Sequence, residues 1–362
     1  MRTTTFGRVR SRLALRICAA ALAAAALAGS VAYADPAQAA VLAPPPVPLA
    51  GHCSMITIPV SLNAVDPANQ TVAAEYCTPV LHTQTVDTLV AGATYNHEYW
   101  DPPVDHGAYS FVRYDLLAGH ATLAIDRIGT GQSSHPPSAD LTISVDAYVL
   151  HQAIAYVRAE GYTQVNVIGH SLGAVVAATD ANEWPGDPTR LVLTGYLNSY
   201  APFTADPASI ASTLYPAVFD PLFADSGLDE DYFTTVPNAR GQMFYYPATE
   251  NQAVVNWDEA NKDVIALNEV EELNPIGVNP ANTSSITVPV LILDGQDDLL
   301  FCVNNSQVNC ASWSAMKAAE EPFFPSVSSL TAESVPETGH ALALATSAPV
   351  SFGLIAAWLG TH

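Results

Sequence analysis

The chain has 362 residues, and its 35 acidic residues outnumber its 12 basic residues, which gives a formal net charge of −23 at pH 7. Nucleic acid and anionic membrane surfaces repel so acidic a protein, so we expect neither of them as a partner. Beyond its N-terminal part, the chain is long enough for one large domain with an insertion.

The N-terminal residues have the pattern of a Sec-type signal peptide. The apolar run at 17–28 is too short to span a bilayer comfortably, and small-residue cleavage sites follow it. Unpaired arginines precede the run: Arg2, Arg8, Arg10, Arg12 and Arg16. We expect a signal peptide at 1–39, cleaved after Ala34 or Ala39, then a proline-rich leader at 40–51 and a secreted protein. The alternative is an uncleaved anchor; after cleavage we expect no stable membrane anchor.

Five cysteines are present, and Cys18 falls within the predicted signal peptide. The remaining even number suggests two disulfides, as is common in exported proteins. The near-neighbour pairs are Cys53 with Cys77 and Cys302 with Cys310, although the sequence leaves the connectivity open. Their spacing is not that of metal ligands.

Strand patterns alternate with helical patterns along the rest of the chain. Two β-branched segments around the turn formers at 66–69 predict an N-terminal hairpin. Two helical patterns run up to glycines, Gly119 and Gly161, as expected near helix C-termini. The expected helices are 109–117, 143–157, 174–178 and 349–359. The segments that begin as strands are 56–62, 70–77, 86–96, 121–134, 165–168, 189–198 and 287–298.

This alternation predicts an α/β fold, with a mostly parallel sheet covered by helices on both faces. Functional groups in such sheets collect at the carboxyl ends of the strands. Residues 199–286 interrupt the alternation after the sixth core strand, and 255–273 look helical. We expect a cap insertion at 199–286 over a core of 52–198 and 287–362. The alternative is a surface subdomain without a part in substrate binding.

A serine lies between two glycines at 169–173, where a strand ends and an alanine-rich helix begins. A serine there could cap the helix. The glycines instead favour a sharp turn with close packing, because they lack a Cβ. The G-x-S-x-G pattern is that of the nucleophile elbow, which exposes the serine Oγ at the sheet edge. We predict Ser171 as the nucleophile, with His170 packed beside it and taking no part in proton transfer.

A nucleophilic serine needs a histidine to accept its proton and a carboxylate to orient that histidine. Among the ten histidines, His340 lies in a turn between the expected last strand and the C-terminal helix. Three carboxylates lie together at the end of an earlier strand: Asp294, Asp297 and Asp298. These residues supply candidates for the base and for the acid.

From about Thr85 to the C-terminus the chain resembles the α/β-hydrolase superfamily, in which serine, acid and histidine follow in this order. The resemblance implies the α/β-hydrolase fold and a secreted member similar to serine esterases and lipases. In relatives the acid lies three residues after the glycine of the strand end, which points to Asp298 rather than Asp297. Some relatives place the acid after the sixth strand, but 195–198 contain no carboxylate here.

An oxyanion hole needs two backbone N–H donors. We expect one from Leu172, directly after the nucleophile. The other lies in relatives in the loop after the third strand, which carries His-Gly. This chain has Ala-Gly-Ala-Thr at 91–94, so the histidine is missing, and we assign Ala93 with Thr94 as the alternative. Residues 126–133 resemble a structural loop of the family and are expected to shape the pocket floor.

The predicted reaction is hydrolysis of a small-molecule or lipid ester through an acyl-enzyme, with no cofactor and no metal. A serine nucleophile disfavours dehalogenase and epoxide hydrolase chemistry, for which relatives use aspartate. An aminopeptidase or amidase, or an acyltransferase, would use the same three residues. A non-catalytic binding protein of the same fold is the alternative from another class. The natural substrate and the oligomeric state stay open.

Overall fold

The computed structural model describes residues 51–200, 213–304 and 308–362. The predicted signal peptide at 1–39 lies outside the described residues, as does the leader except for its last residue. The first part of the predicted cap, at 201–212, also lies outside them. Within the described part of the chain, every helix is too short or too polar to cross a membrane.

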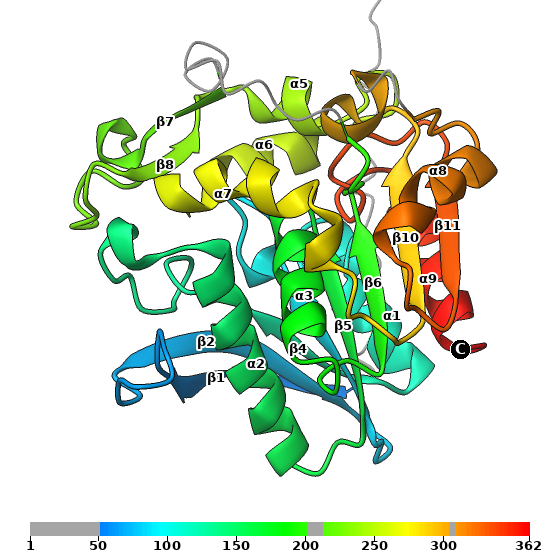
Figure 1. The fold of residues 1–362 in the computed structure, drawn as a ribbon. Helices are drawn as coiled ribbons and strands as arrows, with labels where there is room; N and C mark the ends of the chain where they lie inside the picture. Colours follow the sequence, from blue (N-terminus) through cyan, green and yellow to red (C-terminus); the bar gives the residue numbers. More distant parts are fainter. Residues whose placement is uncertain (1–50, 201–212, 305–307) are drawn as a thin grey trace, which may run out of the picture. The chain divides into compact units, whose positions relative to one another are not determined.

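An eight-stranded sheet forms the centre of the fold (Figure 1). Its strands are β1 (Gly51–Val60), β2 (Gln70–Pro79), β3 (Thr85–Val90), β4 (Ala121–Ile125), β5 (Gln164–His170), β6 (Arg190–Thr194), β10 (Val290–Gly295) and β11 (Leu330–Val335). Their order is β1-β2-β4-β3-β5-β6-β10-β11. β2 pairs antiparallel with both neighbours, and all other neighbours are parallel. The predicted mostly parallel sheet is confirmed.

Helices cover both faces of this sheet, as predicted (Figure 1). The core helices are α1 (Phe111–Ala118), α2 (Ile143–Ala159), α3 (Leu172–Glu183), α8 (Trp313–Glu320) and α9 (Ala348–Leu359). Apolar residues of α1 and α9 share one buried cluster with the sheet, and those of α2, α3 and α8 share another. The strands lie between the two clusters and are covered on both faces. Every residue of β4 and β10 is therefore buried.

Local chemistry explains where several of these helices begin and end. The side chain of Ser110 accepts the N–H of Arg113 at the start of α1, and that of Thr142 accepts the N–H of Val145 at the start of α2. Gly119 ends α1 with φ 86°, a left-handed conformation that glycine adopts without strain. The sequence therefore located the end of α1 correctly.

In the described residues, a small antiparallel sheet and several helices follow β6 in the chain and lie over the carboxyl ends of its neighbouring strands (Figure 1). The strands are β7 (Leu214–Pro216), β8 (Tyr232–Thr235) and β9 (Ile265–Ala266); the helices are α5 (Arg240–Phe244), α6 (Gln252–Ala260) and α7 (Leu267–Gly277). We call residues 213–286 the insertion. Its function as a cap, and the predicted boundaries, stay predictions.

The prediction of one helical segment over 255–273 is wrong. The chain leaves α6 at Ala260, forms β9, and then begins α7. Two buried residues fix the break: Lys262 Nζ lies 2.8 Å from a carboxylate oxygen of Asp220, and Asp263 accepts the side-chain amide of Asn96 at 2.9 Å. Helical periodicity does not reveal these contacts with residues distant in sequence. The contacts override the local helix propensity here.

Both near-neighbour cysteine pairs form disulfides, which settles the connectivity that the sequence left open. Cys53 and Cys77 face each other in the β1–β2 register and are joined, and Cys302 is joined to Cys310. The first bridge crosslinks the antiparallel edge of the sheet. The second lies in the loop that follows β10.

Glu75 on β2 is a carboxyl group that the fold keeps partly out of water. Its Oε2 atom is buried and has no hydrogen-bond partner among the described residues. Burial, with a smaller contribution from the nearby Asp101 carboxylate, raises the pKa of Glu75 from 4.5 to about 7. The folded protein therefore holds this proton more tightly than the unfolded chain does.

Glu75→Gln is expected to change stability in a pH-dependent way. Because the folded pKa is the higher one, the contribution of Glu75 to stability is complete below about pH 4.5 and is lost as the pH rises through about 7. The neutral glutamine should therefore raise the melting temperature relative to wild type at pH 8 and leave it nearly unchanged at pH 4. Glu321→Gln, at an exposed position, is the control; an equal effect of both variants at pH 8 would contradict the assignment.

Candidate active site

The turn between β5 and α3 holds Ser171 in a strained conformation. Its φ is 53° and its ψ is −121°, in a region that residues with a Cβ rarely adopt. Close packing enforces the turn: a Cβ on Gly169 would lie 2.3 Å from the carbonyl oxygen of Gly173, and one on Gly173 would lie 2.3 Å from that of Val90. Both flanking positions therefore require glycine, as the sequence pattern predicted.

Ser171, His340 and Asp298 form one hydrogen-bonded series. Ser171 Oγ lies 2.9 Å from His340 Nε2, and His340 Nδ1 lies 2.7 Å from Asp298 Oδ2. The serine makes no side-chain cap of α3, so the capping alternative is wrong. The other carboxylate oxygen of Asp298 accepts the N–H groups of Leu300 (2.7 Å) and Phe301 (3.3 Å). The carboxylate is fully buried, with both oxygens satisfied, and so fixes the imidazole.

Of the three carboxylates at the end of β10 and directly after it, the structure brings Asp298 to the histidine. The neighbouring Asp297 contributes its backbone N–H to Thr338 O at 2.9 Å, and its side chain is half-buried. Asp294 is fully buried, and burial, with the nearby Asp298 carboxylate, raises its pKa well above the ordinary range. The geometry therefore favours Asp298 as the carboxylate that orients His340.

His170, which we predicted to pack beside the serine, packs against the rings of Tyr99 and His340. Its ring stacks on Tyr99 with centroids 4.4 Å apart and lies 4.8 Å from the ring of His340. Burial, and the proximity of His340, lower the pKa of His170 well below 6.5, so it is neutral at pH 7. Tyr99 also accepts the N–H of Ala343 at 3.2 Å. The sequence analysis missed Tyr99, because nothing local distinguishes it from other loop aromatics.

The loop after β3 lies against the serine. A Cβ on Gly92 would come within 2.9 Å of Ser171 Cβ, so this glycine allows the close approach. The N–H of Tyr95 is bonded to Gly92 O at 3.3 Å, which makes Ala93 and Thr94 the central residues of a turn. Ala93 is half-buried, and Thr94 is fully buried with φ 59°. The predicted second donor loop is therefore beside the nucleophile.

Leu172 is the first residue of α3, next to the serine. The first N–H groups of an α-helix have no acceptor within the helix, so this donor is available to a ligand oxygen. A helix N-terminus also carries partial positive charge, which stabilises an anion. Leu172 and the loop after β3 thus offer the kind of backbone donors that an oxyanion requires.

The loop at 126–133 is organised by its first residue. One oxygen of Asp126 lies 2.7 Å from His97 Nδ1 and accepts the His97 N–H, while the other accepts the N–H of Gln132 at 2.8 Å. A Cβ on Gly131 would lie 2.3 Å from this carboxylate, which explains the glycine. These contacts support a structural function; that the loop shapes a pocket floor stays a prediction.

The Cys302–Cys310 disulfide begins in the helical turn that follows Asp298. The carbonyl oxygen of Asp298 accepts the N–H groups of Cys302 (3.0 Å) and Val303 (2.7 Å), so the cysteine belongs to the helical turn that the acid begins. The carbonyl oxygen of Cys310 accepts the hydroxyl of Ser334 on β11. The bridge thus connects the turn after Asp298 to the neighbouring strand.

Groups of residues with metal-binding side chains occur elsewhere in the described part of the chain. Apart from a group that includes the Cys53–Cys77 disulfide, they are Asp87 with Asp115 and His120, and His151 with Asp180 and Asp187. In each of these two groups the histidine is already bonded to an aspartate of the group. None includes a residue of the Ser171 series.

The site consists of a strained serine at a strand-to-helix turn, joined by hydrogen bonds to a histidine and an aspartate. On a mostly parallel sheet, this arrangement is typical of α/β proteins with a hydrolase-type site. Residues 89–351 match the Alpha/beta hydrolase family, so the chain belongs to the α/β-hydrolase family. The resemblance inferred from the motifs is confirmed at this level.

Individual relatives are distant. The chain is 26% identical over 220 residues to RutD of Klebsiella pneumoniae (strain 342), named as a candidate carbamate hydrolase, covering 58% of this chain and 76% of that protein. Among solved structures, lip1 of Acinetobacter baumannii AYE, titled a lipase candidate, superimposes with a TM-score of 0.56 at 15% identity over 86% of this chain and 92% of that one. An esterase of Thermogutta terrifontis gives 0.53 at 17% identity, over 85% and 98%. These similarities establish the fold.

Asp298→Asn should reduce ester turnover far more than Asp297→Asn, by about two orders of magnitude or more. Loss of the carboxylate that accepts the Nδ1 proton leaves the histidine in the wrong tautomer, whereas Asp297 has no such bond. Steady-state kcat/KM for a nitrophenyl ester measures the difference. Equal losses in the two variants would overturn the assignment of the acid.

The two disulfides should affect different properties. The chain-entropy estimate assigns about 3–4 kcal/mol of stability to the longer Cys53–Cys77 loop and about 2–3 kcal/mol to the shorter one. The Cys53→Ser, Cys77→Ser double variant should lower the melting temperature and keep its turnover while folded. The Cys302→Ser, Cys310→Ser double variant should lose turnover while still folded, because the turn after the acid is released. Full turnover in both would disprove the link to the acid.

Proposed function

We propose that this chain is a secreted serine hydrolase that cleaves carboxylic esters through an acyl-enzyme. The hydrogen-bonded series Ser171–His340–Asp298, with distances of 2.9 and 2.7 Å, is the observation that carries the proposal. A nucleophile within reach of its base, and a base oriented by a third group, are what acyl transfer requires. The strained turn that presents the serine supports the same chemistry.

In the first step, Ser171 Oγ attacks the ester carbonyl carbon while His340 Nε2 accepts the hydroxyl proton. The carbonyl oxygen becomes an oxyanion and accepts hydrogen bonds from the N–H groups of Leu172 and Ala93. The bond to the alkoxy oxygen then breaks, and the alcohol leaves with the proton from His340. Water repeats the sequence on the acyl-enzyme and releases the acid, while Asp298 holds the imidazole throughout.

The ester as substrate is supported by the titles of the solved structures, which describe esterases and a lipase candidate. An amidase, an aminopeptidase or an acyltransferase would use the same residues, and the name of RutD adds carbamates as a substrate class to be tested. A non-catalytic binding protein would not need a serine, a histidine and an aspartate in hydrogen-bond contact. A small-molecule or lipid ester is therefore the proposed substrate.

We also propose that the protein acts outside the cell. The arginine-rich and apolar pattern at 1–39 supports export, and the two disulfides suit an oxidising compartment. The insertion would then act as a cap for substrates met outside the cell. Its position over the carboxyl ends of the strands is consistent with this (Figure 1).

A fluorophosphonate probe should label the wild-type protein on Ser171 and fail to label Ser171→Ala, because the probe reacts only with an activated serine. Ser171→Ala and His340→Ala should each lose nearly all turnover and keep the wild-type melting temperature within a few degrees. Ser226→Ala, which changes a serine of the insertion that is bonded to Phe223 O, is the control. Labelling of Ser171→Ala equal to wild type would refute the proposed nucleophile.

Substrate class is tested on the same proteins with nitrophenyl esters of graded acyl length, an aryl carbamate and aminoacyl anilides. We expect Ser171-dependent hydrolysis of the esters to have the highest kcat/KM. A higher kcat/KM for the anilides or the carbamate would replace the ester proposal with the corresponding alternative. Transfer of the acyl group to added alcohol in preference to water would indicate an acyltransferase.

A further inference from the structure

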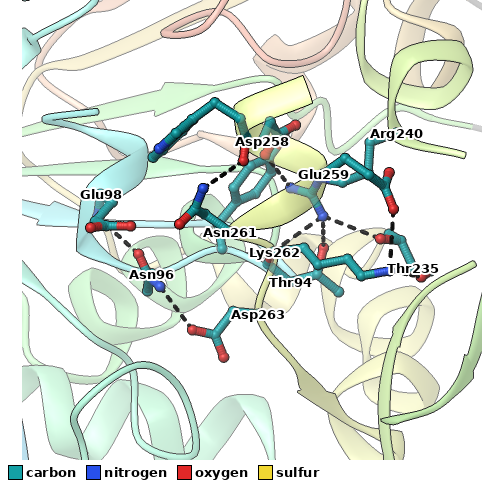
Figure 2. Close-up of polar contacts among 12 residues, drawn as sticks. Thr94, Asn96, Glu98, Thr235, Arg240, Asp258, Glu259, Asn261, Lys262 and Asp263 are labelled. Atoms are coloured by element: carbon teal, nitrogen blue, oxygen red, sulfur yellow. Dashed lines mark hydrogen bonds and ion pairs between the residues drawn. The ribbon is translucent and has the colours of Figure 1, made fainter. Parts of the chain in front are cut away.

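A buried arginine of the insertion, which forms an ion pair within the insertion, also bonds the loop beside Ser171 (Figure 2). Arg240, the first residue of α5, is fully buried, and its Nη2 lies 2.8 Å from Asp258 Oδ1. Its Nη1 donates to the hydroxyl of Thr94 at 2.8 Å and lies 3.4 Å from the Thr94 carbonyl oxygen. One guanidinium thus contacts both a helix of the insertion and the turn that contains Ala93.

This turn is held in a conformation that it would not adopt alone. Thr94 has φ 59°, which is unfavourable for a β-branched residue. Such strain persists only where the surroundings enforce it. Besides the contacts from Arg240, the Thr94 carbonyl oxygen accepts the N–H of Asp263 at 2.9 Å, and Asp263 in turn accepts the Asn96 side chain at 2.9 Å (Figure 2).

Helix α5 of the insertion also contacts the loop that carries His340. The Arg240 guanidinium lies 4.2 Å from the ring centroid of Tyr95 and 5.0 Å from that of Phe244. The ring of Phe244 lies 5.5 Å from that of His340, and its carbonyl oxygen accepts the N–H of Ala341 at 2.9 Å. Residues of α5 therefore contact the loops on both sides of the serine.

We propose that Arg240 is a positioning residue for the oxyanion-binding loop and acts through the hydroxyl of Thr94. The inference rests on the proposed function, because it assigns a purpose to the loop only if Ala93 donates to an oxyanion. Arg240 is not a catalytic residue, since it reaches the reaction only through this turn. Catalysis responds to shifts of order 1 Å, and loss of one oxyanion donor lowers kcat about 10²–10³-fold.

Lys262 provides a matched control within the same part of the molecule. It is also a buried cation of the insertion, and both it and Arg240 donate to Thr235 (Figure 2). Its Nζ lies 2.8 Å from an oxygen of Asp220, 3.3 Å from one of Glu259 and 2.8 Å from Thr235 O. These partners all belong to the insertion. Its removal should disturb the insertion without releasing the turn at Thr94.

Thr94→Val is the decisive variant, because it keeps the shape and the backbone N–H and removes only the hydroxyl. We expect kcat to fall about 10–100-fold with KM changed by less than about threefold, since the loss concerns the transition state. Thr94→Ser should stay within about threefold of wild type. Arg240→Lys keeps a cation for Asp258 but replaces the planar guanidinium with a single ammonium group. Its kcat should therefore fall as much as that of Thr94→Val.

Three readouts separate positioning from a merely structural effect. The affinity for a trifluoromethyl ketone, which forms an oxyanion on the serine, should fall by the same factor as kcat/KM, whereas Lys262→Met should lower only the melting temperature. The rate at which a fluorophosphonate labels Ser171 should fall likewise in Thr94→Val. This labelling measurement does not require the natural substrate to be known.

Equal kcat losses in Thr94→Val and Lys262→Met, or wild-type kcat and inhibitor affinity in Thr94→Val, would overturn the positioning inference alone. A wild-type protein that the probe does not label would overturn the proposed function and the inference together. If the probe labels the wild type and labels all variants at the same rate, Ser171 remains the proposed nucleophile, but the positioning function of Arg240 is rejected.

Discussion

The close approach of α3 to β3 is the steric constraint on which the site depends. Gly173 at the start of α3 lies so near Val90 O that no side chain fits between them. The chain can make this contact only by turning sharply at Ser171, which accounts for its positive φ. Since the loop after β3 begins beside Val90, the same contact brings Gly92 against the serine. One packing requirement thus places both Ser171 and the neighbouring loop.

The electrostatic design follows from how each buried carboxyl group is satisfied. Asp298 accepts hydrogen bonds from two backbone N–H groups and from the histidine, so both of its oxygens have partners inside the protein. Asp294 accepts the N–H of Gly295 with one oxygen, while the other has no hydrogen-bond partner among the described residues, and burial raises the pKa of Asp294 well above its ordinary range. Two aspartates four residues apart therefore differ in how their oxygens are satisfied, because one begins a helical turn and the other lies at the end of a strand.

The sequence was enough to select the three residues that the structure joins by hydrogen bonds, but not the contacts that support them. Ser171 and His340 were predictable because short local patterns set their places at the ends of strands, and the choice of Asp298 came from resemblance to a family. The break between α6 and α7, the stacking of Tyr99 and the bond from Arg240 to Thr94 were not predictable. Each depends on a partner distant in sequence, which neither periodicity nor propensity encodes.

The polar contacts between the insertion and the core explain how a separate segment can set the geometry of the site. Apolar burial stabilises an interface but is non-directional, so it tolerates small sliding movements. Hydrogen bonds to a planar guanidinium do not tolerate them, because donor and acceptor directions are fixed. Arg127 in the loop after β4 bonds Asp146 of α2 and Glu269 of α7, and Arg240 bonds the turn after β3. Two buried arginines therefore hold the insertion in place against the loop after β3 and against α2 and the loop after β4.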